Sequence, residues 1–199
     1  MKEAIELFKS FLPENYSKDK QGENVYKHSL TVAFAAKTIA AKTENLDPKK
    51  AFLYGLMHDI GKFFLSKPEI YKHPRIGYEL TKLKYPDIAE ICVSHPFPNF
   101  ALKSYFTQYC AGDAFEADRI EKALSGVKIN DYIELIQLCD KLSGINDYMS
   151  LELKFKWYKD NYQIYEESFK ANYKKLSEIK LKFDAAIKNN VYTLLGIKT

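Results

Sequence analysis

The chain has 199 residues, of which 46% are hydrophobic, and this suits one domain with a sizeable core rather than a disordered chain. Its apolar runs are too short to cross a bilayer, and its N-terminus lacks a signal-peptide core, so a cytoplasmic protein with no membrane partner is expected. The net charge of +4 comes mainly from lysines spread along the chain, which argues against a dedicated nucleic-acid surface and leaves a small anionic substrate open.

Helical periodicity begins at the N-terminus. A short amphipathic helix is expected to stop at Pro13, and a polar loop is expected over residues 17–22. A strong helix is then predicted from Asn24 to about Thr43. The next helix is predicted to begin with Asp47 as its N-cap, followed by a proline in the first turn, and to end at Gly61.

The remainder of the chain also reads as helical. Prolines divide the middle of the chain into short helices and connections. Asn130 is predicted to cap a helix, and one or two long helices rich in aromatic and basic residues are predicted from Leu151 onward, packing back on the rest. No segment shows a convincing strand alternation. The predicted fold class is therefore all-α, in a single domain over residues 1–199.

Several ionisable side chains stand inside apolar segments. The stretch GLMHDIGKFFL places His58, Asp59 and Lys62 among oily residues, His28 lies on the apolar stripe of its helix, and Asp140 interrupts the run ELIQLCDKL. A buried polar group without a partner costs free energy, so these side chains need partners or must hold something that is not protein. Imidazole and carboxylate are metal ligands, and one metal centre would explain all of these placements.

The order of these residues resembles that of the HD-domain superfamily of metal-dependent phosphohydrolases. LMHDIGK (Leu56–Lys62) is similar to the central motif of that family, and LCDKLSG (Leu138–Gly144) is similar to its closing Asp segment. HPRIGYEL (His73–Leu80) resembles its intermediate His segment. The resemblance implies an HD-domain helical bundle with a core at about 24–147 and C-terminal helices at 148–199.

The resemblance also implies a ligand set. The simplest members hold one metal with the first His, the His-Asp pair and the last Asp, whereas dinuclear members use six ligands. The six candidates in this chain are His28, His58, Asp59, His73, His95 and Asp140. Asp59 would then bridge two divalent ions, for which iron, manganese or zinc suits the His and carboxylate donors. His73, in KHPR, is also compatible with a solvated loop.

The function that the resemblance implies is hydrolysis of a phosphate ester or anhydride by attack of a metal-bridging hydroxide. Asp59 and Lys62 are the candidate catalytic residues, with Lys62 neutralising charge on the phosphoryl group, and Arg75 is a weaker candidate for a phosphate contact. Lys62 and Arg75 are each also compatible with a solvated position on the surface that has no part in catalysis. The chain lacks the HDxxED motif of the alarmone hydrolases and the GYP motif of the cyclic-dinucleotide branch of this family, which disfavours alarmones and cyclic di-GMP without excluding the latter. The remaining resemblance implies a nucleotide or a dinucleoside polyphosphate as the substrate.

Three further interpretations stay open. An HD-fold mixed-valence di-iron oxygenase would use the same six-ligand order, although the lysine of HDIGK favours phosphate chemistry. A non-catalytic HD signalling module is a second alternative, but such modules usually lose ligands, and all six candidates are present here. Four aromatic residues are candidates for stacking on a base, although helical spacing of aromatic residues is more typical of a core: Tyr105, Phe106, Tyr109 and Trp157.

Overall fold

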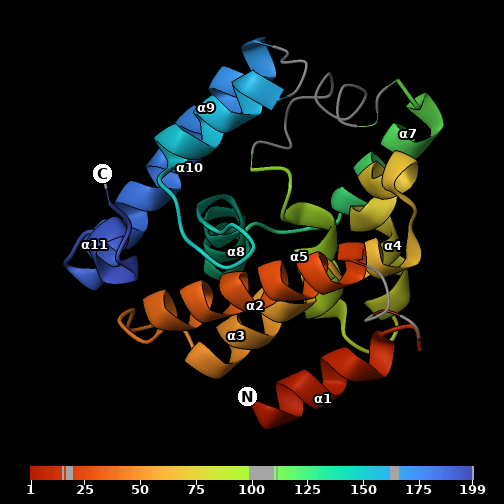
Figure 1. Cartoon of the computed structure of the whole chain (residues 1–199), viewed down its shortest axis with the longest axis horizontal. Helices are drawn as coiled ribbons and strands as arrows, with labels where there is room; N and C mark the ends of the chain where they lie inside the picture. The colour runs from red at the N-terminus through yellow and green to blue at the C-terminus, as the bar shows by residue number, and fades with distance from the viewer. Residues whose placement is uncertain (15, 17–19, 99–109, 111, 162–165, 199) are drawn as a thin grey trace.

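The computed structural model describes residues 1–14, 16, 20–98, 110, 112–161 and 166–198, and most of these are helical (Figure 1). In chain order the elements are α1 (Lys2–Phe11), α2 (Lys20–Ala40), α3 (Pro48–Met57), η2 (Ile60–Phe64), η3 (Lys67–Lys72), α4 (His73–Thr81), α5 (Pro86–Ser94), α7 (Ala114–Leu124), α8 (Asp131–Leu142), α9 (Leu151–Asn161), α10 (Glu166–Ile187) and α11 (Val191–Leu195). Within the described ranges, β pairing is limited to one isolated bridge between Ser143 and Tyr148. The predicted all-α class is confirmed.

Helix α2 begins earlier than the sequence suggested. The predicted polar loop at 17–22 is wrong over residues 20–22, which already belong to the helix, while residues 17–19 lie outside the described ranges. The reason lies at Gly22, where a Cβ atom would stand 2.1 Å from the carbonyl oxygen of Tyr16. Because glycine lacks that atom, the backbone of Tyr16 packs directly against the first turn of the helix.

Helix α3 starts as predicted but ends sooner. The carboxylate of Asp47 accepts hydrogen bonds from the backbone N–H groups of Lys49 and Lys50, as an N-cap does. The predicted end at Gly61 is wrong, because α3 ends at Met57 and Gly61 lies within the short 3₁₀ segment η2. A Cβ atom at Gly61 would lie 2.2 Å from the carbonyl oxygen of His73, so this glycine permits close packing of η2 on α4.

Two more glycines hold neighbouring helices close together. At Gly55 a Cβ atom would lie 2.6 Å from the Cα atom of Ala33, so α3 approaches the backbone of α2 directly. At Gly77 a Cβ atom would lie 2.9 Å from Cβ of Cys92, which brings α4 against α5. The polar residues at the ends of these helices are thereby brought to one place in the molecule.

The C-terminal helices share the main core. Asn130 caps α8 as predicted, with its side chain accepting from the N–H groups of Tyr132 and Ile133. Two long helices, α9 and α10, follow Leu151 as predicted and lie against each other at one end of the molecule (Figure 1). Their buried apolar residues belong to the same hydrophobic cluster as those of α2, α3 and α8. In the described part of the chain, no helix combines the length and apolarity that a membrane span needs.

Candidate metal centre

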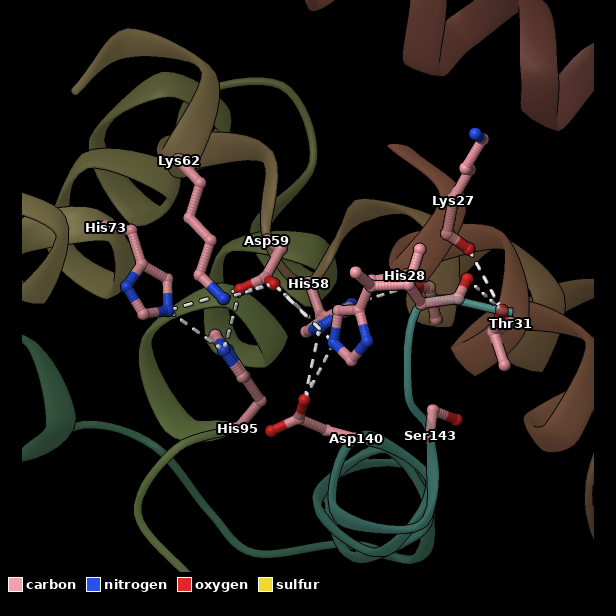
Figure 2. Close-up of polar contacts among 12 residues, drawn as sticks. Lys27, His28, Thr31, His58, Asp59, Lys62, His73, His95, Asp140 and Ser143 are labelled. Atoms are coloured by element: carbon pink, nitrogen blue, oxygen red, sulfur yellow. Dashed lines mark hydrogen bonds and ion pairs between the residues drawn. The ribbon is translucent and has the colours of Figure 1, made fainter. Parts of the chain in front are cut away.

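The six predicted ligands come from five places in the chain and meet in the interior (Figure 2). They are His28 on α2, His58 and Asp59 directly after α3, His73 at the start of α4, His95 directly after α5, and Asp140 near the end of α8. Two overlapping sets of three have all their ligand atoms within 4.8 Å of one another: His28, His58 and Asp140, and His58, Asp59 and His95. His73 is 6% exposed, so it lies in the interior and not in a solvated loop.

Asp59 stands at the middle of the cluster. Its Oδ2 atom lies 3.3 Å from Nε2 of His58 and 3.8 Å from Nε2 of His28. Its Oδ1 atom lies 3.2 Å from Nε2 of His73 and 3.3 Å from Nε2 of His95. The two carboxylate oxygens therefore face two different pairs of histidines, which lie on opposite sides of Asp59 in Figure 2.

Asp140 belongs to one of these two groups. Its Oδ1 atom lies 3.0 Å from Nε2 of His28 and 3.7 Å from Nε2 of His58. We term His28, His58 and Asp140 the Asp140 side of the centre, and His73 and His95 the His95 side. On the His95 side, the two Nε2 atoms are 3.2 Å apart.

The histidine rings are oriented by the backbone. In every case the Nδ1 atom lies within hydrogen-bond distance of a carbonyl oxygen: Gly144 for His28 (2.9 Å), Gly55 for His58 (2.7 Å), Ile70 for His73 (2.7 Å) and Cys92 for His95 (2.9 Å). A carbonyl oxygen only accepts hydrogen bonds, so Nδ1 carries the proton and Nε2 is directed at the cluster. Such outer contacts fix the tautomer and the ring orientation of metal-binding histidines.

The two sides differ in electrostatics. Burial lowers the pKa of His95 to about 3, and burial together with the charge of Lys62 lowers the pKa of His73, so both rings are neutral. Burial also disfavours charge on His58, but the carboxylates of Asp59 and Asp140 outweigh it and raise the pKa of His58 to about 9. The pKa values of both carboxyl groups stay well below the ordinary range despite burial, because His58 and nearby lysines favour their ionised form.

The cluster contains polar atoms that the protein itself leaves unsatisfied. Nε2 of His58 and Oδ1 of Asp59 are two of the five buried side-chain atoms without a hydrogen-bond partner among the described residues. Leaving such atoms unpaired in the interior costs free energy. Cations held between imidazole nitrogens and carboxylate oxygens would satisfy both atoms, and this donor set suits iron, manganese or zinc. The residues present therefore fit the implied metals.

The predicted substrate-binding cations have different surroundings. Nζ of Lys62 lies 2.5 Å from Oδ2 of Asp59, at the centre itself. Arg75 is buried, and its Nε donates to Oε1 of Glu116 on α7 at 2.6 Å. This ion pair does not involve any of the six candidate metal ligands. The phosphate contact predicted for Arg75 stays a prediction.

Lys141 also lies at the centre, although the sequence analysis did not single it out. Its Nζ atom lies 2.5 Å from Oδ2 of Asp140. Its position directly after Asp140 in the sequence was the signal that could have identified it.

Only one of the four aromatic candidates for base stacking, Trp157, is among the described residues. Tyr105, Phe106 and Tyr109 lie outside the described residues. Trp157 lies on α9 with 46% of its surface exposed and packs beside Tyr158. Stacking of a base on Trp157 stays a prediction.

Comparison with known protein families identifies the class to which this fold and site belong. The HD domain family model matches residues 25–145, which is more than half of the chain and includes all six candidate ligands. The chain belongs to the HD-domain family of metal-dependent phosphohydrolases. No solved structure matches.

The curated relatives share this region. Ribonuclease Y of Bacillus velezensis and that of Bacillus subtilis are each 34% identical over 137 residues, which is 67% of this chain and 25% of the relative. Ribonuclease Y of Campylobacter fetus is 35% identical over 100 residues, which is 49% of this chain and 19% of the relative. The chain thus spans about a quarter or less of the length of these relatives, and the likeness concerns the HD region.

Proposed function

We propose that this chain hydrolyses a phosphate ester or anhydride of a nucleotide or a dinucleoside polyphosphate, with two divalent metal ions held by the six clustered ligands. The observation that carries the proposal is the position of Asp59. Its Oδ1 faces His73 and His95 and its Oδ2 faces His28 and His58, so a single carboxylate is placed to contact two ions. In two-metal phosphate chemistry, ions about 3.5–4 Å apart stabilise both the attacking and the leaving oxygen.

The residues of the centre have different proposed roles. When bound, two divalent ions supply an activated water and clamp the phosphoryl oxygens of the substrate. The imidazoles would hold the ions, and the carbonyl oxygens that accept from Nδ1 keep each ring in its direction. Lys62 contacts Asp59 and remains partly exposed, so it is placed to neutralise charge that develops on the phosphoryl group.

The relatives support phosphate ester chemistry. By name, ribonuclease Y acts on RNA, whose linkages are phosphate esters, and it is similar to this chain in the HD region. For this chain we propose a smaller substrate, because its lysines are spread over the sequence and arginines are rare. The rival interpretation, a di-iron oxygenase, needs the same ligands but gives no role to Lys62.

The test is phosphate release from a panel of nucleotides, dinucleotides and short RNA, with added Mn²⁺ or Fe²⁺. We expect turnover by the parent and loss of turnover in Asp59→Ala, together with loss of both metals by elemental analysis. Asp118→Ala, which removes an exposed carboxylate on α7, is the matched control and should retain activity. Full metal content in Asp59→Ala would refute the bridging role. A protein that holds two irons, consumes dioxygen and releases no phosphate would be an oxygenase.

A further inference from the structure

A buried glutamine on α8 holds the backbone around His95. Gln137 is 1% exposed, and its Nε2 donates to the carbonyl oxygens of Ser94 at 3.0 Å and of Phe97 at 3.3 Å. Ser94 stands directly before His95, and Phe97 stands two residues after it. The amide group of Gln137 therefore contacts the backbone on both sides of this candidate ligand.

The end of α5 explains why a donor from another helix is needed there. Helix α5 ends at Ser94, and the last carbonyl groups of a helix have no partner within that helix. The carbonyl oxygen of Ser94 also accepts from the N–H of Phe97, which closes a turn around His95. Residues 91–98 are all buried, and a buried carbonyl group without a hydrogen bond costs free energy. Gln137 satisfies the carbonyl groups at both ends of this turn.

The position of Gln137 in its own helix links this turn to the other side of the centre. Asp140 lies three residues further along α8, and residues three apart share one face of a helix. One face of α8 thus carries the carboxylate of the Asp140 side and, one turn earlier, the amide that holds the turn with His95. The position of the His95 side relative to the Asp140 side therefore depends on α8 as well as on Asp59.

The ring of His95 depends on the place of this turn. Its Nδ1 donates to the carbonyl oxygen of Cys92 at 2.9 Å, and its Nε2 lies 3.3 Å from Oδ1 of Asp59. Both contacts require the backbone of His95 to stay in one position between the last turn of α5 and Asp59. A turn that is held at both ends meets this requirement.

We propose that Gln137 is a positioning residue of the metal centre, which fixes His95 and thereby sets the affinity of the His95 side for its ion. This role rests on the proposed function and concerns the same site. Gln137 is not one of the six candidate ligands, and it acts through the backbone of the turn. Removal of groups that support metal ligands commonly costs about 10–100-fold in metal affinity.

A purely structural role would also explain a buried amide group that satisfies carbonyl oxygens. In that case the loss of Gln137 would lower the free energy of unfolding, while the folded protein would keep the orientation of His95 and its affinity for metal. The state of the ring and the binding of the two ions therefore separate the two roles.

The first experiment is nitrogen-15 NMR of the metal-free full chain, labelled at its four histidines. The spectrum shows which ring nitrogen carries the proton, and in the parent this should be Nδ1 of His95, as the contact with Cys92 requires. Gln137→Met keeps the length of the side chain but removes its donors, so His95 should show a mixture of both tautomers. The signals of His28, on the Asp140 side, should not change.

The second experiment is titration of the same proteins with Mn²⁺ in competition with a chelator. The parent should bind two ions. In Gln137→Met the weaker ion should bind on the order of 10-fold less tightly, and the tighter ion should be unaffected. Gln137→Asn keeps an amide group on a side chain that is one methylene shorter. If Gln137→Met does not fold, Gln137→Asn should show the same changes to a smaller degree.

Ile133→Val is the matched control. Ile133 is buried on α8 one helical turn before Gln137 and belongs to the main hydrophobic cluster. Loss of one methylene there should lower stability without changing the signals of His95 or the binding of metal. Glutamine variants that behave like Ile133→Val would overturn the positioning role. A parent that binds no metal would refute the proposed function, whereas changed His95 signals in Gln137→Met would still establish that Gln137 orients the ring.

Discussion

The two sides of the metal centre are built from different chemistry. The Asp140 side has a carboxylate of its own, and the side chain of His28 is 16% exposed. The His95 side has only its share of Asp59, and the side chain of His95 is 2% exposed. A divalent cation gains more from two carboxylates than from one, whereas buried neutral imidazoles offer ligation without charge. The Asp140 side should therefore bind its ion more tightly, and the His95 side should lose its ion first to a chelator.

The largest effect on turnover is expected when the carboxylate that distinguishes the Asp140 side is removed. Asp140→Asn keeps the shape of the side chain but removes its charge, so the Asp140 side should lose its ion and turnover should fall on the order of 10³-fold. His73→Ala should instead remove mainly the ion of the His95 side. Elemental analysis of both variants checks this, with one ion expected to remain in each. Loss of both ions in His73→Ala would show that the two sides do not act separately.

Removing Lys62 tests a side chain that is proposed to contact the substrate and not to bind either metal ion. In Lys62→Gln both metals should stay, because Lys62 is not one of the six proposed ligands and its ammonium group contacts one oxygen, Oδ2, of Asp59. The turnover number should fall on the order of 10²-fold, as expected for loss of one electrostatic stabiliser of the transition state. Steady-state kinetics together with metal analysis measure this. Unchanged turnover would remove Lys62 from the catalytic residues.

A packing change should affect the His95 side selectively. In Gly61→Ala the new methyl group would stand 2.2 Å from the carbonyl oxygen of His73, which is backbone and cannot turn away. Shifting α4 should cost about 1–3 kcal/mol of unfolding free energy and weaken the ion on the His95 side. Chemical denaturation and metal analysis check both effects. Gly126→Ala is the control, since no atom lies within 4 Å of its added carbon, and it should leave stability and metal content unchanged.

The sequence was sufficient to predict the helical class and to single out the residues that meet at the centre. Apolar periodicity identifies helices, and a polar residue that breaks an apolar run, such as Asp140, has to be explained by a partner or a ligand. Gly61 was wrongly assigned as the end of α3, because its role depends on its short distance from the backbone of α4. That distance is a property of the tertiary structure.

Side-chain direction limited the prediction of substrate contacts. Arg75 was chosen for its position near His73, but successive residues on a helix point in different directions, and this side chain turns to Glu116 on α7. The contact of Lys154, on α9, with the carbonyl oxygen of Ser143 could not be predicted either, because it requires the chain to fold back from α8 into α9. Short-range sequence patterns do not show which segments the folded chain brings back into contact.

The smallest predicted effect is the pH dependence of the metal-free protein, in which the two sides should act in opposite directions. The folded pKa of His58, about 9, is above its ordinary value of 6.5, so its stabilising contribution is complete below about pH 6.5 and is lost as pH rises through about 9. The folded pKa of His95, about 3, is below the ordinary value, so stability is lost as pH falls from about 6.5 toward 3. The thermal unfolding temperature should therefore be highest between these two flanks.

Metal binding should change the pH dependence of the unfolding temperature on the alkaline side only. A bound ion requires neutral imidazole, so the metal-loaded protein has no His58 proton to lose, and its unfolding temperature should not fall between about pH 7 and 9. In the metal-free form, His58→Gln should remove the alkaline flank and keep the acid flank, because His95 is unchanged. Thermal unfolding of both forms across this pH range measures the difference. A metal-free parent with no alkaline flank would show that the carboxylates of Asp59 and Asp140 do not hold a proton on His58, and the charge contrast between the two sides would then be wrong.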